Sequence, residues 1–201
     1  MTDTLDQPSF IGVWQRESLS VEKGEAFEDS NVLWLHAGDY FADLRWPKPG
    51  FTHVKSSAFA GRAYWNAPSM KFIHEIDLTK ELEEDTGILS FSNGKLIEAG
   101  QVTIEDKMIR FEETWIRLSR ADQGGCQIAR KSQALDSAYI IRIADFVIAM
   151  EETEQGFSAA GWRYENENWN LLFGLGDIQR LSEFRSALSA DTLPQEWQVK
   201  I

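Results

Sequence analysis

Residues 88–99, ILSFSNGKLIEA, contain the strongest fold signal in the chain. Two runs in which apolar and polar residues alternate, Ile88–Phe91 and Lys95–Ala99, flank the turn Ser92-Asn93-Gly94. Asn and Gly both tolerate the positive φ angles of a tight two-residue turn, so this pair between alternating runs predicts a β-hairpin. The hairpin in turn predicts antiparallel strand pairing near the middle of the chain.

The same alternation recurs on both sides of this hairpin. Its period of two is that of half-buried strands and not that of helices. Most of the chain is therefore predicted to be all-β. Besides the two hairpin runs, the strand candidates are Phe10–Val21, Val32–His36, Tyr40–Trp46, Ala58–Trp65, Met70–Leu78, Val102–Ile104, Lys107–Leu118, Cys126–Lys131, Tyr139–Met150, Phe157–Tyr164 and Trp169–Leu175.

One segment near the C-terminus has helical periodicity instead. Asp177 can cap a helix that ends before Pro194, and we expect this helix over approximately 177–190. Short, regularly spaced strands followed by one amphipathic helix favour a closed antiparallel barrel, which leaves no exposed strand edge. We predict a single domain over 1–201, an up-and-down barrel of about 8–10 strands with a C-terminal helix, and a β-sandwich is the alternative. The apolar stripe of the predicted helix consists of Ile178, Leu181, Phe184 and Leu188.

The composition limits the classes of partner and the compartment. Lys and Arg number 20 against 32 Asp and Glu, a formal net charge of −12, so phosphate backbones and anionic membranes would be repelled. Cys126 is the one cysteine and cannot form an intrachain disulfide, and the acidic start of the chain differs from a secretion signal. No window approaches the roughly 18 apolar residues of a membrane span. These features predict a cytoplasmic protein that has no membrane span and binds no nucleic acid.

Gly12-Val13-Trp14 lies at the head of the first predicted strand. It resembles the Gly-x-Trp motif of lipocalins and other calycin barrels, in which the indole plugs the closed end. Secreted lipocalins also carry a downstream Asp-Tyr pair and a late Arg that packs on the Trp. Here Asp39-Tyr40 comes early, and the sequence places no such Arg clearly. The resemblance therefore points to the intracellular calycins, which include binders of fatty acids, haem or bilins and a few enzymes.

A second resemblance rests on Trp34-Leu35-His36-Ala37-Gly38 followed by Ala42-Asp43-Leu44-Arg45. These segments are similar to a small group of fungal lipocalin-like barrel proteins that are named for interacting with a casein-kinase-type kinase. The resemblance implies a lipocalin-like barrel and keeps a protein partner among the alternatives.

Several charged residues lie in strands whose neighbours are apolar. Alternate positions of a barrel strand face the lumen, so Asp43 and Arg45 project to the same side, as do Arg62 and Tyr64. The same holds for Arg110 with Glu112 on a later strand. Either side of each strand can face water, so these pairs are candidates for a lumen site only if their side is the inner one.

Arg142 is the clearest anomaly, because its strand is otherwise almost wholly apolar. Arg suits bidentate recognition of carboxylate or phosphate, so an Arg in the lumen would anchor the acidic end of an amphipathic ligand. The alternative is an Arg near a strand end that reaches solvent or pairs with Asp43 or Glu98.

Aromatic residues and histidines supply the remaining candidates. Trp34 and Trp115 fall on predicted strands and would line a cavity or, as the alternative, fill a packed barrel core. His74 shares a strand face with Phe72 and Ile76, as an axial haem ligand or as a core histidine satisfied by a hydrogen bond. No His or Cys spacing supports a metal site. No cofactor is predicted, although haem and bilin stay open.

We predict that the chain binds a small apolar or amphipathic acidic ligand in the barrel lumen. The first alternative is an enzyme acting on a small aromatic or fatty acid, with Glu98 or Glu112 as general acid or base. The second is a ligand-free scaffold that binds another protein, and a homodimer also stays open. An error of one residue in strand register would reverse every lumen assignment. The candidate ligand-binding residues are Arg62, Tyr64, Arg142, Trp34, Trp115, His74 and Glu98.

Overall fold

A computed structural model of the protein describes residues 10–80, 84–104, 107–120, 125–133, 136–193 and 196–200. The central hairpin forms as predicted, with β6 (Glu84–Ser92) paired antiparallel to β7 (Lys95–Ile104). Asn93 and Gly94, at its turn, have φ angles of 51° and 78°. Both residues therefore adopt the left-handed backbone that the two-residue turn requires, which explains the choice of Asn-Gly.

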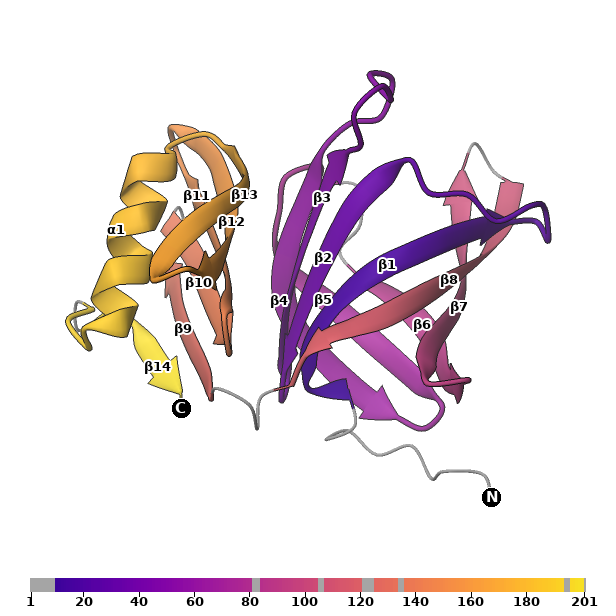
Figure 1. Ribbon diagram of the computed structural model, residues 1–201, viewed down its shortest axis with the longest axis horizontal. Coiled ribbons are helices and arrows are strands. Elements are labelled where there is room, and N and C mark those ends of the chain that lie inside the picture. Colours follow the sequence, from indigo (N-terminus) through magenta and orange to yellow (C-terminus); the bar gives the residue numbers. More distant parts are fainter. Residues whose placement is uncertain are drawn as a thin grey trace.

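Eight consecutive strands close into an antiparallel barrel, which β1 and β8 complete by pairing with each other (Figure 1). The closed barrel confirms the predicted fold class and excludes the sandwich for this part of the chain. Besides β6 and β7, the barrel strands are β1 (Gly12–Val21), β2 (Ser30–Ala37), β3 (Tyr40–Pro47), β4 (Ser57–Asn66), β5 (Ser69–Asp77) and β8 (Lys107–Ser119).

The barrel interior is aromatic, and Trp14 lies near one end of it. The Trp14 Nε1 group donates a 2.8 Å hydrogen bond to the Phe10 carbonyl oxygen. The guanidinium of Arg117 on β8 lies 4.3 Å from the Trp14 ring centroid. The sequence alone placed no such Arg, because Trp14 and Arg117 become partners only when β1 pairs with β8. The apolar lumen residues are Phe10, Trp14, Val32, Trp34, Phe41, Phe59, Ala63, Met70, Phe72, Leu89, Leu96 and Trp115.

Six further strands form a second antiparallel sheet, in the order β13-β12-β11-β10-β9-β14. The sequence predicts one barrel from all of the strand candidates, and the second sheet corrects this prediction. Its strands are β9 (Cys126–Gln133), β10 (Asp136–Ile143), β11 (Phe146–Thr153), β12 (Gly156–Glu165), β13 (Asn168–Leu175) and β14 (Gln198–Lys200).

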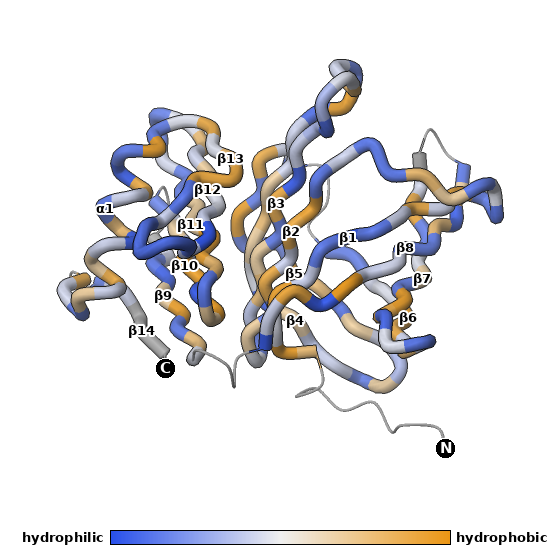
Figure 2. The backbone as a smooth tube through the Cα atoms, viewed as in Figure 1, coloured by the Kyte–Doolittle hydropathy of each residue, from blue (hydrophilic) through white to orange (hydrophobic). Residues whose placement is uncertain are grey.

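The second sheet packs one face against the outer wall of the barrel. Leu33 and Leu44 from the barrel share an apolar cluster with Ile141 and Ile148 from the sheet. Figure 2 shows this interface as hydrophobic stretches on barrel strands β2 to β4 and on the sheet that faces them. Because β10 and β11 are covered on both faces, they consist of nearly continuous apolar runs instead of alternating ones.

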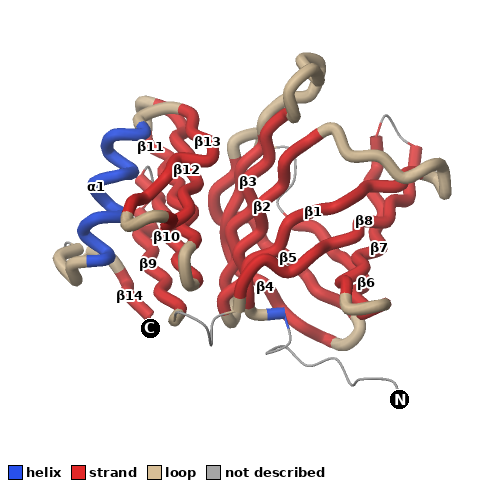
Figure 3. The backbone as a smooth tube through the Cα atoms, in the orientation of Figure 1, coloured by secondary structure: helices blue, strands red, loops and turns tan. Residues whose placement is uncertain are grey.

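The predicted helix forms as α1 (Ile178–Ser189) and covers the face of the second sheet that points away from the barrel (Figures 1 and 3). The Asp177 side chain caps it by accepting a 3.0 Å hydrogen bond from the Arg180 backbone N–H. Leu181 and Leu188 are its buried residues. Pro194, expected after the helix, lies outside the described residues. No helix in the described part of the chain is long and apolar enough to cross a membrane.

Candidate functional site

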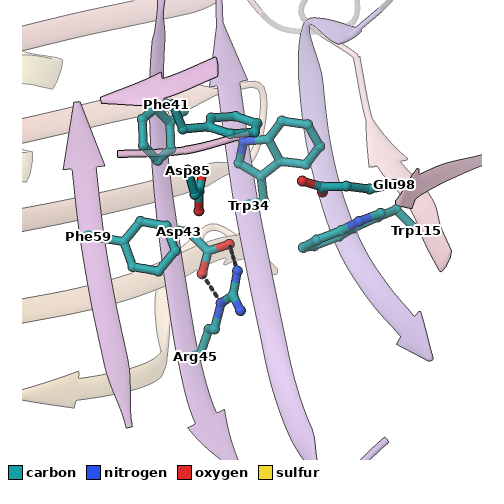
Figure 4. A pocket seen from close by; sticks show the side chains of 9 residues that line it. Trp34, Phe41, Asp43, Arg45, Phe59, Asp85, Glu98 and Trp115 are labelled. Carbon is teal, nitrogen blue, oxygen red and sulfur yellow. Dashed lines mark hydrogen bonds and ion pairs between the residues drawn. The ribbon is translucent and has the colours of Figure 1, made fainter. Parts of the chain in front are cut away.

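A pocket lies inside the barrel and receives at least one side chain from every strand from β2 to β8 (Figure 4). Its lining side chains surround about 260 Å³ of space that includes open solvent, and the room inside for a water-sized molecule is about 20 Å³. A cavity needs about 10–15 Å³ of such room to hold one water molecule, so the enclosed part of the pocket takes only a small group, and the rest of the pocket is open to solvent. Its lining residues are Trp34, Phe41, Asp43, Arg45, Phe59, Phe72, Asp85, Glu98 and Trp115.

The inner part of the pocket is aromatic and contains polar atoms without partners. Trp34 and Trp115 are 2% and 1% exposed, and their ring centroids lie 5.4 Å apart at an angle of 63°. Within the described residues, the Nε1 groups of both indoles and Asp85 Oδ1 are buried and have no hydrogen-bond partner. A buried donor or acceptor without a partner costs about 1–3 kcal/mol, so these atoms are available to a bound molecule or to water.

The solvent end of the pocket is charged. The Arg45 side chain is 29% exposed and the Asp85 side chain 39% exposed, which makes them the most accessible ionic groups of the lining. Asp43 holds Arg45 bidentately, accepting from Nε at 2.7 Å and from Nη2 at 3.1 Å. The Arg45 guanidinium also lies 5.1 Å from the Phe59 ring centroid. Arg45 is therefore already occupied by a carboxylate and an aromatic face.

A second buried guanidinium lies next to this group, on β1. Arg16 Nε donates to Glu28 Oε2 at 2.8 Å, and its Nη1 donates to Glu113 Oε1 at 2.5 Å. Arg45 Nη1 lies 3.9 Å from the same Glu113 oxygen. The two arginines are thus linked through Glu113, and their charges are compensated within the lumen.

Glu98 on β7 has no such cation. Its carboxyl packs over β6, where a Cβ on Gly87 would come within 2.3 Å of Glu98 Oε1, so only Gly leaves it room. Burial raises the pKa of Glu98 well above its usual range, and the nearby Glu113 and Asp85 carboxylates raise it further, against the opposing effect of Arg45. Glu98 is consequently biased toward its protonated form.

His74 lies beside the pocket and is held by two carboxylates. Its Nδ1 is 2.8 Å from Asp77 Oδ2 and its Nε2 is 3.6 Å from Asp85 Oδ2. Its ring stacks on Phe59 with centroids 4.3 Å apart. Burial alone would lower the pKa of His74, but the interactions with Asp77 and Asp85 raise it to about 9. His74 is therefore a cation at neutral pH.

The structure brings four of the seven predicted site residues together. Trp34, Trp115 and Glu98 line the pocket, and His74 lies against its wall through Phe59. The predicted inward side of Asp43 and Arg45 is also where the structure places them.

Arg62 and Tyr64 do not face the lumen. In β4 the inward positions belong to Phe59 and Ala63, so the even-numbered residues point outward. Arg62 pairs with Glu75 at 3.1 Å on the outer wall, and Tyr64 is 50% exposed. The prediction that both residues face the lumen was wrong. Side chains alternate between the two faces of a strand, and Arg62 and Tyr64 lie on the face opposite to Phe59 and Ala63.

Arg142 lies outside the barrel altogether. It belongs to β10 of the second sheet, on the same side as Ile140, which packs toward α1. Its Nε donates to the Ala144 carbonyl oxygen at 3.3 Å, and its guanidinium lies 5.5 Å from the Trp169 ring centroid. Its apolar strand neighbours reflect burial between the barrel and α1, not a position in the lumen.

Three residues of this region were not predicted from the sequence. Arg16 and Glu113 each lie two positions from a lumen Trp, Trp14 and Trp115, so their shared strand face was an available signal. Asp85 lies in the acidic stretch that begins β6, and no feature of the sequence distinguishes it from its acidic neighbours.

No protein-family model and no curated protein matches this chain. Among solved structures, the uncharacterized protein YLR301w from Saccharomyces cerevisiae is similar, with a TM-score of 0.64, 15% sequence identity, and coverage of 82% of this chain and 85% of that chain. Since the barrel strands end at Ser119 of 201 residues, the match extends into the second sheet. At this identity the likeness concerns the fold alone.

Proposed function

We propose that this chain is a small-molecule-binding protein of the calycin type that holds its ligand in the barrel lumen. The observation that carries the proposal is the set of three buried polar atoms without partners, Trp34 Nε1, Trp115 Nε1 and Asp85 Oδ1, around one pocket of the described structure. A filled structural core would be expected to satisfy or exclude such groups. The Arg117 guanidinium on Trp14 adds to the resemblance to calycin barrels.

The ligand of this pocket is small. The room of about 20 Å³ inside the pocket does not accommodate a fatty acid, haem or bilin. Neither Arg62 nor Arg142 anchors a ligand in this pocket, because neither lines it. The cytoplasm remains the expected compartment.

A panel of small amines, neutral alcohols and amides, and carboxylic acids tests this function by ligand-observed NMR on the full chain. Asp85→Trp would plug the solvent end of the pocket, and Glu112→Trp on the exposed outer wall is its control. The proposal expects at least one compound to bind the wild type and the control but not the plugged variant, with folding of each checked by its amide spectrum. Binding of no compound, or binding that the plug leaves unchanged in a folded variant, would contradict it.

A second candidate function is an enzyme that uses Glu98 as a general acid. Its support is specific, because Glu98 is a buried carboxyl with a raised pKa beside a cavity. A compound from the panel that binds and is then chemically altered by the wild type but not by Glu98→Gln would favour this candidate. Binding without turnover would favour the carrier.

A further inference from the structure

The ionic groups of the lumen are unequal in number. Around the pocket, within the described residues, two guanidinium groups face five carboxyl groups. The pair of His74 and Asp77 leaves this imbalance unchanged, and the Arg117 guanidinium lies on the Trp14 ring and does not line the pocket. The arginines and their carboxylate partners are Arg16 with Glu28 and Glu113, and Arg45 with Asp43.

This pairing leaves Asp85 and Glu98 as the carboxyl groups that no arginine holds. Asp85 approaches His74 through Oδ2 only, whereas its Oδ1 is buried without a partner. Glu98 is 9% exposed and faces the carboxylates of Asp85 and Glu113. The lumen therefore has an excess of acid at the pocket itself.

The aromatic side chains that line the pocket favour a cation, as the excess of carboxyl groups does. Aromatic faces attract cations, and Phe59 already holds two of the protein's own, the Arg45 guanidinium at 5.1 Å and the stacked His74 ring at 4.3 Å. Trp34 and Trp115 hold no cation in the described structure and line the pocket next to the Glu98 carboxyl (Figure 4). Their unpartnered, nine-tenths buried side chains are an indication of a ligand that is independent of the acidic groups.

An acidic ligand is disfavoured by the same geometry. It would meet the Asp85 carboxylate, and the guanidinium at the pocket is already held bidentately by Asp43. A neutral apolar ligand would leave the Asp85 and Glu98 groups desolvated without compensation.

We infer that the lumen pocket binds a small organic ammonium ion, whose charged nitrogen lies between Asp85 and Glu98 and whose apolar body contacts Trp34 and Trp115. This inference rests on the proposed function and reverses the sign of the ligand that the sequence predicted. It assigns Asp85 and Glu98 as the residues that determine ligand charge.

Benzylammonium, benzyl alcohol and benzoate test the inference, since they share one ring and nearly one size but differ in charge. Isothermal titration calorimetry should show that benzylammonium binds at least about tenfold more tightly than either other compound, because hydrogen bonds to charged groups are stronger than neutral ones. Asp85→Asn and Glu98→Gln should each weaken benzylammonium binding about tenfold. Glu112→Gln, an exposed carboxyl one position from Glu113, should leave it unchanged.

The possible results distinguish failure of the ammonium assignment from failure of the proposed small-molecule binding. Tighter binding of benzyl alcohol or benzoate, or unchanged benzylammonium affinity in both folded carboxyl variants, would overturn the ammonium assignment and leave a lumen-binding protein. A lumen ligand in the wider panel that is neutral or anionic would do the same. Failure of every compound to bind would overturn the proposed function itself.

A second readout depends on the proton of Glu98. A cation beside Glu98 lowers its pKa and expels its proton, so the affinity for benzylammonium should rise with pH as long as the ligand stays charged. The groups that face Glu98 are Asp85, Glu113, Asp43 and Arg45, and all are retained in Glu98→Gln. That variant should lose most of the pH dependence, and an unchanged dependence would contradict the placement of the ammonium beside Glu98.

Discussion

The barrel wall separates two buried regions of opposite chemistry. Its inner side encloses aromatic rings, ionic groups and a pocket, whereas its outer side meets the second sheet through mostly aliphatic residues such as Leu33, Leu44, Ile141 and Ile148. Ionic contacts to the sheet, such as Arg130 with Glu75 at 2.8 Å, involve partly exposed side chains. The outer interface thus supplies packing, whereas the lumen encloses polar groups that packing does not require and that the proposed ligand would contact.

Among the tests of this contrast, Arg16→Met has the largest expected effect. Removal of the guanidinium leaves Glu28 and Glu113 as buried carboxylates without their partner, which should lower the free energy of unfolding by about 3–5 kcal/mol. Denaturant unfolding at neutral pH measures the loss. Arg110→Met, at an exposed position of β8, is the control and should change little. Equal effects of both variants would show that the lumen ion pairs are replaceable by apolar packing.

The next effect is the pH dependence that His74 confers. Because the pKa of His74 is raised to about 9 from an ordinary 6.5, its stabilisation is complete below pH 6.5 and is lost as pH rises toward 9. The loss of unfolding free energy over this window is at most about 3 kcal/mol. Thermal unfolding as a function of pH should show it in the wild type but not in His74→Gln. If the stability of His74→Gln fell with rising pH as steeply as that of the wild type, a group other than His74 would cause the pH dependence.

The outer interface can be tested by overpacking. A Cβ on Gly161 of β12 would lie 2.9 Å from Leu44 Cδ2 on the barrel, so Gly161→Ala should destabilise the protein by about 1–3 kcal/mol. Leu44→Ala combined with Gly161→Ala should cost less than the sum of the two single changes, because the methyl group then has room. Additive losses would show that the two sheets do not meet as closely as described.

The same contrast explains which parts of the molecule the sequence could predict. The hairpin at Asn93-Gly94 and the helix capped by Asp177 depend on local residues, and both were found. The division of strands between barrel and second sheet depends on which distant strands pair, so Arg142 was assigned to the wrong sheet. Its neighbours held the missing signal, since the apolar run through β10 and β11 is typical of strands covered on both faces.

Only those features of the candidate site that follow from strand periodicity were predicted. Trp34, Trp115 and Glu98 were identified because large aromatics and an embedded acid stand out in alternating strands. The proposed preference of the pocket for a cation was not predicted, because it depends on how Asp43 holds Arg45 and on the approach of Asp85 from another strand. Pairing between side chains from different strands is a property of the closed barrel and leaves no pattern in the sequence.

The smallest predicted effect is a difference in unfolding free energy between variants of two tryptophans in the lumen. Trp14 Nε1 donates to the Phe10 carbonyl oxygen, and its ring carries the Arg117 guanidinium, whereas Trp115 Nε1 has no partner in the described structure. Both changes to Phe remove similar apolar area, so Trp14→Phe should cost about 1 kcal/mol more unfolding free energy than Trp115→Phe. Denaturant unfolding of the two variants measures the difference. If Trp115→Phe cost as much unfolding free energy as Trp14→Phe, the Trp115 indole N–H would have to be hydrogen-bonded, and the pocket would lack a free donor on which the proposed ligand binding depends.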